Sequence, residues 1–249
     1  MLKLYSFGPG ANSLKPMLAL FEKFTFGQQF TVHQLNPRNF EHHADWFKAL
    51  NPRGQVPALE DANLPEGANI ITESTVICEY LEDAHPTAVK LRPTSHYDVA
   101  QMRCWTKWVD EYFCWCVSTI GWHRHVSTMV KDLSEAEFEE VVARIPVFEQ
   151  QVKWRRAREG FPADLLDEEM RKVAVSVRKL DDHLADNEWL AGGVYSLADI
   201  CNYSTAAHLT MGYDELVNTE DSPHLLRWID QIKARPAVVE MYAKVPREF

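Results

Sequence analysis

Apolar and polar side chains alternate with two different periodicities along the first third of the chain. Residues 2–7 and 29–34 show the alternation of a strand, whereas apolar residues recur at helical intervals from Ser13 to about Phe24. A helix that crosses between two strands joins them in the same direction, so we expect these two strands to pair in parallel.

The rest of this region has a different order. We expect a short irregular helix over 40–50, a hairpin of two short strands over 56–60 and 70–72, and a closing helix over 74–85. The side chains of the closing helix that we expect to face inward are Val76, Ile77, Tyr80 and Leu81. The order βαβ followed by ββα predicts a mixed sheet, because the hairpin adds antiparallel strands.

After residue 86 the strand pattern disappears. Residues 85–94 are typical of a linker, with two prolines in ten positions. Helical spacing then predicts helices over about 95–128, 134–159, 166–186, 197–211 and 222–234. The sequence therefore predicts an α/β domain over 1–86 and an all-helical domain over 95–249.

Composition and charge narrow the choice of partners. The 249 residues are 46% apolar and include eight tryptophans, enough to build sizeable cores. A formal net charge of −10 argues against nucleic acid as the main partner, because binding phosphates requires a basic surface. One basic cluster, Lys153 to Arg158, is interpreted as a solvated helix face.

Neither a membrane anchor nor a disulfide framework is expected. No stretch approaches the roughly 20 apolar residues of a membrane span, and no signal peptide precedes the first strand. The odd number of cysteines and the absence of Cys-x-x-Cys favour buried thiols in a reducing compartment, so we expect a cytoplasmic protein. The five cysteines are Cys78, Cys104, Cys114, Cys116 and Cys201.

The segment from Asn51 to Pro57 carries the strongest functional signal. The Val56–Pro57 bond lies where a loop enters a short apolar strand, and an X-Pro bond is the one place where a cis peptide is inexpensive. Such a corner would direct the backbone N–H and C=O of Val56 outward, toward an extended peptide. Glu73 and Ser74 then begin a helix, whose N-terminus attracts a carboxylate. These features suit a small acidic peptide such as glutathione.

Together with 189–193 and the capping-box spacing of Ser196 and Asp199, these motifs resemble the glutathione transferase superfamily. The resemblance implies an α/β, thioredoxin-like N-terminal domain joined to an all-α C-terminal domain. It also implies that Asp199 is a structural cap and that the protein is a homodimer.

A narrower resemblance links the chain to the bacterial glutathione-dependent β-etherases of lignin breakdown. It rests on residues 2–16, 72–83 and 105–122, and it is closest to the branch that acts on the S isomer. The insert at 61–69 is longer than in that branch, and 123–131 and the C-terminal end fit less well. These departures concern fine specificity more than the reaction.

Chemistry in this superfamily begins with a glutathione thiolate. A free thiol has a pKa of about 8.5, and lowering it by two units requires about 2.7 kcal/mol of selective anion stabilisation. A helix N-terminus supplies about 0.3–1 kcal/mol, up to about 2, and a hydrogen bond to a charged group is worth roughly 1.5–3 kcal/mol. Ser13 combines both effects and Asn12 adds an amide donor. The alternative is that Ser13 only caps its helix.

The other glutathione contacts follow from the resemblance. Val56, next to Pro57, would pair with the cysteinyl backbone by strand addition. Glu73 would bind the γ-glutamyl ammonium and Ser74 its carboxylate, unless the two residues merely form an ordinary helix start. The candidates for the glycyl carboxylate are His42, His43, Arg53 and Gln55.

Aromatic residues crowd the first long helix of the second domain. Trp105, Trp108, Tyr112 and Trp115 are spaced by 3, 4 and 3 residues, which predicts a single face that either belongs to the core or receives an aromatic ligand. The residues that we assign to a second-substrate pocket are Trp108, Tyr112, Trp115, Trp122 and His123. The histidine pairs lack accompanying ligands at metal-binding spacing, so no metal is expected.

The resemblance implies a glutathione S-transferase. The glutathione thiolate would displace a phenolate from the β-aryl ether bond of lignin-derived α-keto β-ethers and leave a glutathione thioether. Glutathione is consumed as a cosubstrate, with no metal or redox cofactor. The alternatives are a general transferase or isomerase acting on another electrophile, and a non-enzymatic glutathione-fold binding protein.

Overall fold

The computed structural model describes residues 1–64 and 69–246. The sheet half comprises β1 Leu2–Ser6, α1 Ala11–Lys23, β2 Phe30–Gln34, a 3-10 turn Glu41–His43, α2 Asp45–Leu50, β3 Ala58–Asp61, β4 Asn69–Thr72 and α3 Ser74–Ala84. The four strands lie in the order β2-β1-β3-β4; β1 and β2 are parallel and the other pairs antiparallel, as the sequence predicts. Part of the predicted insert, residues 65–68, lies outside the described residues.

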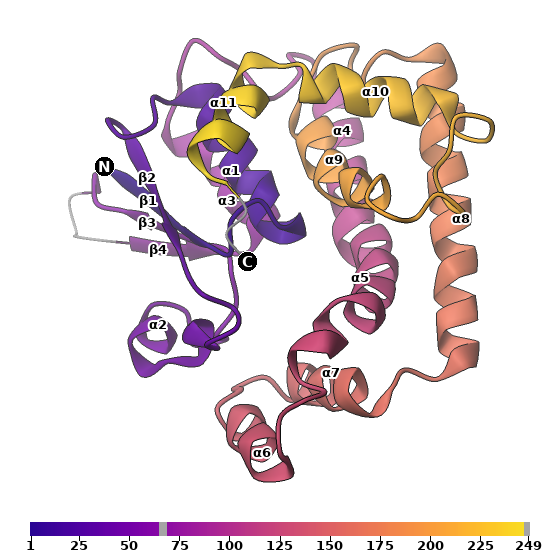
Figure 1. The fold of residues 1–249 in the computed structure, drawn as a ribbon. Coiled ribbons are helices and arrows are strands. Elements are labelled where there is room, and N and C mark those ends of the chain that lie inside the picture. Colours follow the sequence, from indigo (N-terminus) through magenta and orange to yellow (C-terminus); the bar gives the residue numbers. More distant parts are fainter. Residues whose placement is uncertain (65–68, 247–249) are drawn as a thin grey trace.

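The helices α1 and α3 lie between the sheet and the rest of the molecule (Figure 1). Leu14, Met17 and Leu18 on α1 are fully buried because they recur at helical spacing on one stripe. On α3 the buried stripe runs through Ile77 and Leu81. The prediction that Val76 faces inward is wrong: its side chain is 55% exposed, because it precedes this stripe by one position.

The helical half begins after the predicted linker. Its elements are α4 His96–Trp108, a π-helical turn Val109–Phe113, α5 Cys114–Arg124, a 3-10 turn Val126–Met129, α6 Glu135–Ala143, α7 Phe148–Glu159, α8 Ala163–Asp186, α9 Leu197–Leu209, α10 Pro223–Lys233 and α11 Pro236–Lys244. In Figure 1, α4 and α5 form one column beside α8, with α6 and α7 at its lower end. Among the described residues, no helix is both long enough and apolar enough to cross a membrane.

Two helix predictions differ from the structure. The helix expected over 134–159 is two helices, because Pro146 stands between α6 and α7 and disfavours helical geometry at the residue before it. The sequence analysis also missed α11, which begins directly after α10 with Pro236 at its first position.

The predicted capping box at the start of α9 is confirmed. The Asp199 carboxylate accepts hydrogen bonds from the backbone N–H of Ser196 and of Leu190, each at 3.0 Å. It also accepts one from the Trp228 indole of α10 at 3.0 Å. Complete burial nevertheless raises the pKa of Asp199 to about 6. Asp199 therefore fastens three segments of the helical half together.

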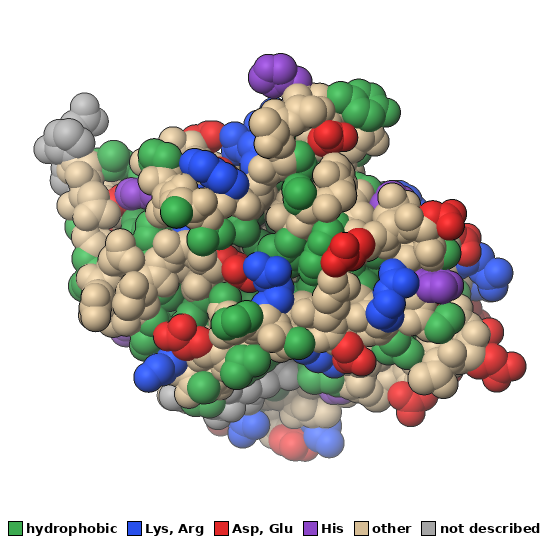
Figure 2. Space-filling model, turned by 90° about the horizontal axis from the view of Figure 1, so that it is seen from above, with side chains coloured by type: hydrophobic (Ala, Val, Ile, Leu, Met, Phe, Trp, Pro, Cys, Tyr) green, Lys and Arg blue, Asp and Glu red, His purple; other side chains and the backbone are tan. Residues whose placement is uncertain are grey.

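Helix α1 joins the two halves. Its buried Lys15 forms an ion pair with Asp110 of the π-helical turn. Near its other end, Glu22 accepts two hydrogen bonds from Arg235, at 2.6 and 3.0 Å. Seen from above, acidic, basic and apolar side chains are interspersed over the surface (Figure 2). The Lys15–Asp110 pair places the N-terminal end of α1 where the sheet half meets the helical half.

Candidate active site

The N-terminal end of α1 offers unpaired backbone donors. The N-cap is Gly10, which has no side chain to cap the first turn, and Leu14 N–H bonds to its carbonyl at 2.7 Å. The alternative that Ser13 caps this helix is wrong, because the N-cap lies three residues earlier and Ser13 lies in the first turn. The free N–H groups and the helix dipole together favour an anion at this point.

Ser13 and Asn12 are the side-chain donors at this helix end. Ser13 is 3% exposed, and its hydroxyl has no hydrogen-bond partner among the described residues. Asn12 is exposed, and its Oδ1 accepts a hydrogen bond from the Cys114 thiol of α5 at 3.4 Å. That contact leaves the amide nitrogen of Asn12 available and places the start of α5 beside the start of α1.

Hydrogen bonds between residues of the loop before β3 fix its shape. The Val56–Pro57 bond is cis, as predicted. Asn51 donates to the Gln55 carbonyl at 2.6 Å and accepts from the Arg53 N–H at 3.1 Å. Val56 lies just ahead of β3, outside the register of the strand pairs, with its side chain partly buried.

Glu73 and Ser74 occupy the start of α3 next to this loop. Glu73 is the N-cap residue and has a positive φ of 67°, a conformation that costs a non-glycine residue of order 1–3 kcal/mol. Its carboxylate lies 3.9 Å from Arg53 Nε, which donates to Gln55 Oε1 at 3.1 Å. The structure thus brings Arg53, Gln55 and Glu73 together, with Ser74 buried at the first helical position.

The two adjacent histidines lie in the 3-10 turn before α2. Both are buried, and the ring of His42 packs edge-on against Phe7 at 4.8 Å. Burial, reinforced by Arg144, lowers the pKa of His42 to about 3 and that of His43 to about 4. Both rings are therefore neutral near pH 7. A neutral ring can still donate one hydrogen bond, and neither Nδ1 has a partner among the described residues.

Sequence reasoning missed the contribution of the α6–α7 connection to this corner. Pro146 Cδ is 3.4 Å from the position that a Cβ would take on Gly54, and the His42 carbonyl is 3.1 Å from it. Gly54 itself has a φ of +60°, so a side chain is excluded there on two grounds. Arg144 is exposed and acts on both histidines, but no sequence motif links it to them.

The aromatic residues on α4 and α5 do not share one environment. Trp108 stacks on Phe113 at 5.2 Å and lies under Lys179 of α8, as part of the packing between helices. Tyr112 and Trp115 are instead 38% and 56% exposed. The π-helical turn explains the difference, because it changes the angular spacing between the two groups.

The last two residues assigned to the pocket lie further along α5. Trp122 packs edge-on against Trp154 of α7 at 4.9 Å, whereas His123 is exposed beside Phe161. The structure therefore distributes the five predicted pocket residues along the α4–α5 column instead of gathering them around one opening.

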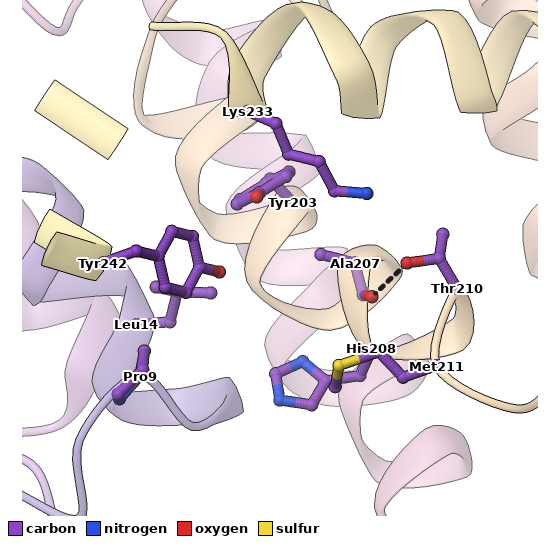
Figure 3. Close-up of a pocket in the computed structure, with 9 residues that line it drawn as sticks. All are labelled: Pro9, Leu14, Tyr203, Ala207, His208, Thr210, Met211, Lys233 and Tyr242. Carbon is purple, nitrogen blue, oxygen red and sulfur yellow. Dashed lines mark hydrogen bonds between the residues drawn. The ribbon is translucent and has the colours of Figure 1, made fainter. Parts of the chain in front are cut away.

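A cavity of about 440 Å³ lies between the start of α1 and the helices α9, α10 and α11. Figure 3 shows Pro9, Leu14 and Tyr242 opposite residues of α9 and α10. The lining residues are Pro9, Leu14, Tyr203, Ala207, His208, Thr210, Met211, Lys233 and Tyr242. Leu14 directly follows Ser13, so the cavity adjoins the anion site. None of its lining residues was assigned from the sequence, because they come from separate elements that are distant in the sequence, one of which is α11.

No metal centre is evident among the described residues, since no three His, Cys, Asp or Glu side chains are grouped to hold an ion. The arrangement of the site instead offers an anion-binding helix end, a backbone edge and an adjoining apolar cavity. These are the requirements for ionising a peptide thiol beside an apolar electrophile.

Comparison with known proteins agrees with this arrangement. Residues 11–84 match the model of the glutathione S-transferase N-terminal domain, and residues 113–236 match that of the C-terminal domain. The chain is 52% identical to Protein LigF from Sphingobium sp. strain NBRC 103272 / SYK-6, over 99% of this chain and 95% of that protein. It is 26% identical to glutathione S-transferase 3 from Zea mays, over 98% of this chain and 95% of the relative.

Solved structures give the same result. The crystal structure of the β-etherase LigF from Sphingobium sp. strain SYK-6 matches with a TM-score of 0.90, covering 98% of this chain and 99% of that one. Glutathione transferase F7 from Populus trichocarpa, 22% identical, matches over both complete chains with a TM-score of 0.73, which supports the fold. The resemblance drawn from the motifs is confirmed: the chain belongs to the glutathione S-transferase family.

Proposed function

We propose that this protein is a glutathione-dependent β-etherase that cleaves the β-aryl ether bond of α-keto β-ethers related to lignin. The observation that carries the proposal is the 52% identity to LigF over 99% of the chain, since the solved LigF structure is that of a β-etherase. The helix end that suits an anion, next to an apolar cavity, supports the same reaction.

Glutathione would lie across the end of the sheet. Its sulfur sits at the start of α1, where the Ser13 hydroxyl and the Asn12 amide donate to the thiolate. The backbone of Val56 pairs with the cysteinyl residue. Glu73 binds the γ-glutamyl ammonium, and Ser74 with the α3 N-terminus binds its carboxylate. Because Ser13 has no other hydrogen-bond partner among the described residues, its hydroxyl is free for this role.

The glycyl carboxylate is assigned to the corner formed by Arg53, Gln55 and His42. Arg53 supplies the positive charge, since the lowered pKa of His42 makes its ring a neutral donor near pH 7. Arg144, across the α6–α7 connection, adds positive potential to the same corner. Arg53 lies 3.9 Å from Glu73 in the structure, so its side chain would turn away from Glu73 to bind the glycyl carboxylate.

The reaction is a displacement at the carbon next to the ketone. The thiolate attacks in line, opposite the ether oxygen, so that the carbon–sulfur bond forms as the carbon–oxygen bond breaks and the configuration inverts. The electron pair of the broken bond leaves with the phenolate. Holding both reactants in this geometry can account for several kcal/mol of the barrier.

The two aromatic rings of such a substrate flank the reacting carbon, and apolar surface lies on two sides of α1. Asn12 and Leu14 are two positions apart, about 200° around the helix, so they face different ways. Leu14 leads to the cavity under Tyr203 and Tyr242, whereas Asn12 leads to the α5 face through Cys114. One ring on each side would place the ether carbon beside Ser13.

Phenol release from a racemic model β-ether ketone, with and without glutathione, tests the proposal. We expect glutathione-dependent release of phenol and formation of the thioether. After partial turnover, the unreacted substrate should be enriched in one enantiomer. Rapid conjugation of generic electrophiles without phenol release would instead identify a general transferase. If neither substrate class showed glutathione-dependent turnover, the non-enzymatic binding protein would be the remaining alternative.

We also propose a cytoplasmic homodimer. Val76 on α3 and Tyr97 on α4 are 55% and 72% exposed, and they leave apolar surface for a second copy. The five cysteines are free thiols, which agrees with a reducing compartment. Light scattering should give twice the chain mass, and Val76→Glu should lower it toward the monomer; a monomeric wild type would contradict the proposal.

A further inference from the structure

Lys153 does not behave as a member of a solvated basic cluster. It lies on α7, which crosses the lower end of α5 in Figure 1, and its side chain is directed at that helix. Its Nζ donates to the Ser118 hydroxyl at 2.9 Å. The same nitrogen lies 4.8 Å from the ring centroid of Trp122 and 5.5 Å from that of Trp115. The predicted solvated face therefore begins with a residue that is turned inward.

This ammonium group lacks an acidic partner. No carboxylate pairs with Lys153 among the described residues, whereas the buried Lys15 and Lys23 pair with Asp110 and Glu82. The groups that surround Nζ are the Ser118 hydroxyl, the two indole rings and the Cys114 thiol. Burial lowers the pKa of Lys153 to about 8. It is thus charged at neutral pH and holds its proton loosely.

The position of Lys153 connects it to the thiolate site. The Cys114 thiol contacts Asn12 at the start of α1, and Ser118 follows Cys114 by one helical turn, about 6 Å along the axis. The Lys153 ammonium therefore meets α5 at Ser118, one turn from the residue that contacts Asn12. The indoles of Trp115 and Trp122 provide flat apolar surface around its nitrogen.

We propose that Lys153 is the general acid that protonates the departing aryl oxide. This inference rests on the proposed etherase reaction. As the thiolate forms the carbon–sulfur bond, the carbon–oxygen bond breaks and its electron pair remains on the phenolic oxygen. That oxygen takes a proton from the Lys153 ammonium, which leaves a neutral phenol and a neutral amine. The amine regains its proton from water after the phenol departs, so the enzyme returns to its starting state.

The direction of proton transfer is favourable. A simple phenol has a pKa of about 10, as in the tyrosine side chain, so the phenolate is the stronger base by about two units. An aryl oxide that is already a weak base, such as 4-nitrophenolate, needs no proton to leave. The contribution of Lys153 should therefore depend on the leaving group, which a purely structural lysine would not show.

The test compares Lys153→Met with wild type on two β-ether ketones, one with a phenoxy and one with a 4-nitrophenoxy leaving group. We expect kcat/KM to fall about 100-fold or more for the phenoxy substrate and only a few-fold for the nitrophenoxy substrate. The matched control is Lys179→Met, since Lys179 also lies over two indoles, those of Trp105 and Trp108, but on α8. It should leave both rates nearly unchanged.

The pH profile gives a second readout. With the phenoxy substrate, wild-type kcat/KM should decline as pH rises through about 8, because the acid loses its proton; Lys153→Met should lack this decline. The nitrophenoxy reaction also reports folding, because an unfolded variant would lose both activities. Equal losses on both substrates, or none, would overturn the role of Lys153. Failure of wild type to release any phenol would instead overturn the proposed function.

Discussion

The two sides of the active site are assembled differently. The glutathione side comes from short consecutive segments of the sheet half: the start of α1, the loop before β3 and the start of α3. The proposed second-substrate side is assembled from α5, α7, α9, α10 and α11, which are spread over the second half of the sequence. In the proposed arrangement the first side would bind one invariant tripeptide, whereas the second could change its ligand through changes at distant residues.

This difference predicts which substitutions lower the stability of the fold and which lower the catalytic activity. Asp199 holds the helical half together and touches no substrate, so its loss should give the largest effect. Asp199→Ala leaves three buried donors without an acceptor and should lower the free energy of unfolding by about 3–5 kcal/mol. Urea denaturation measures this, with Asp182→Ala on the exposed face of α8 as the control. A change below about 1 kcal/mol would contradict the fastening role.

Ser13 should show the opposite pattern, a chemical loss with the fold intact. Ser13→Ala removes a hydrogen bond to an anion worth roughly 1.5–3 kcal/mol, so kcat/KM should fall about 10- to 100-fold. The pKa of bound glutathione, followed by ultraviolet absorbance of the thiolate, should rise toward about 8.5. Ser176→Ala, which removes a buried serine on α8, is the matched control. An unchanged thiol pKa would assign ionisation to the helix end alone.

The corner between the two sides should be sensitive to acid. The folded-state pKa values of His42 and His43 lie below the ordinary value of about 6.5, so the unfolded chain binds more protons on acidification. Their contribution to stability is present above pH 6.5 and is lost as pH falls toward 4. At pH 5 the loss should be about 2 kcal/mol per histidine. His42→Gln should reduce this dependence, and His96→Gln, at the exposed start of α4, should not.

Arg53 should give the smallest effect. Its guanidinium is more than half exposed, so its contribution to binding the glycyl carboxylate is screened by solvent. Arg53→Ala should raise the KM for glutathione about fivefold, equivalent to about 1 kcal/mol, and leave kcat nearly unchanged. Arg38→Ala provides an exposed control outside the site. A larger fall in kcat would show that Arg53 also acts on the reacting sulfur.

Local sequence predicted the proline corner before β3 and the start of α3 because their signals are local. A proline after Val56 and a helix start at Ser74 each depend on neighbours within a few residues. Even on the glutathione side, the N-cap of α1 is Gly10, three positions before Ser13, because glycine at an N-cap is less favourable than serine by only a few tenths of a kcal/mol.

The helical side escaped prediction for a physical reason. The π-helical turn over 109–113 and the inward turn of Lys153 depend on what α4, α5 and α7 meet in space. Helical periodicity cannot report such contacts. The cavity was missed in the same way, since Tyr242 lies on a helix that the pattern did not reveal. Tertiary packing decides these features, and local propensity is too weak to oppose it.

The ion pair between Lys15 and Asp110 limits how the family can diversify. Lys15 is almost completely buried, and its counter-charge comes from the other half of the molecule. Consider a chimera that takes residues 1–94 from this chain and the remainder from a distant relative. Lys15 would then be buried without a counter-charge, unless the relative had an acidic residue at the position of Asp110. New substrate ranges are therefore more readily reached by point changes on α5 and α7 than by exchanging whole halves.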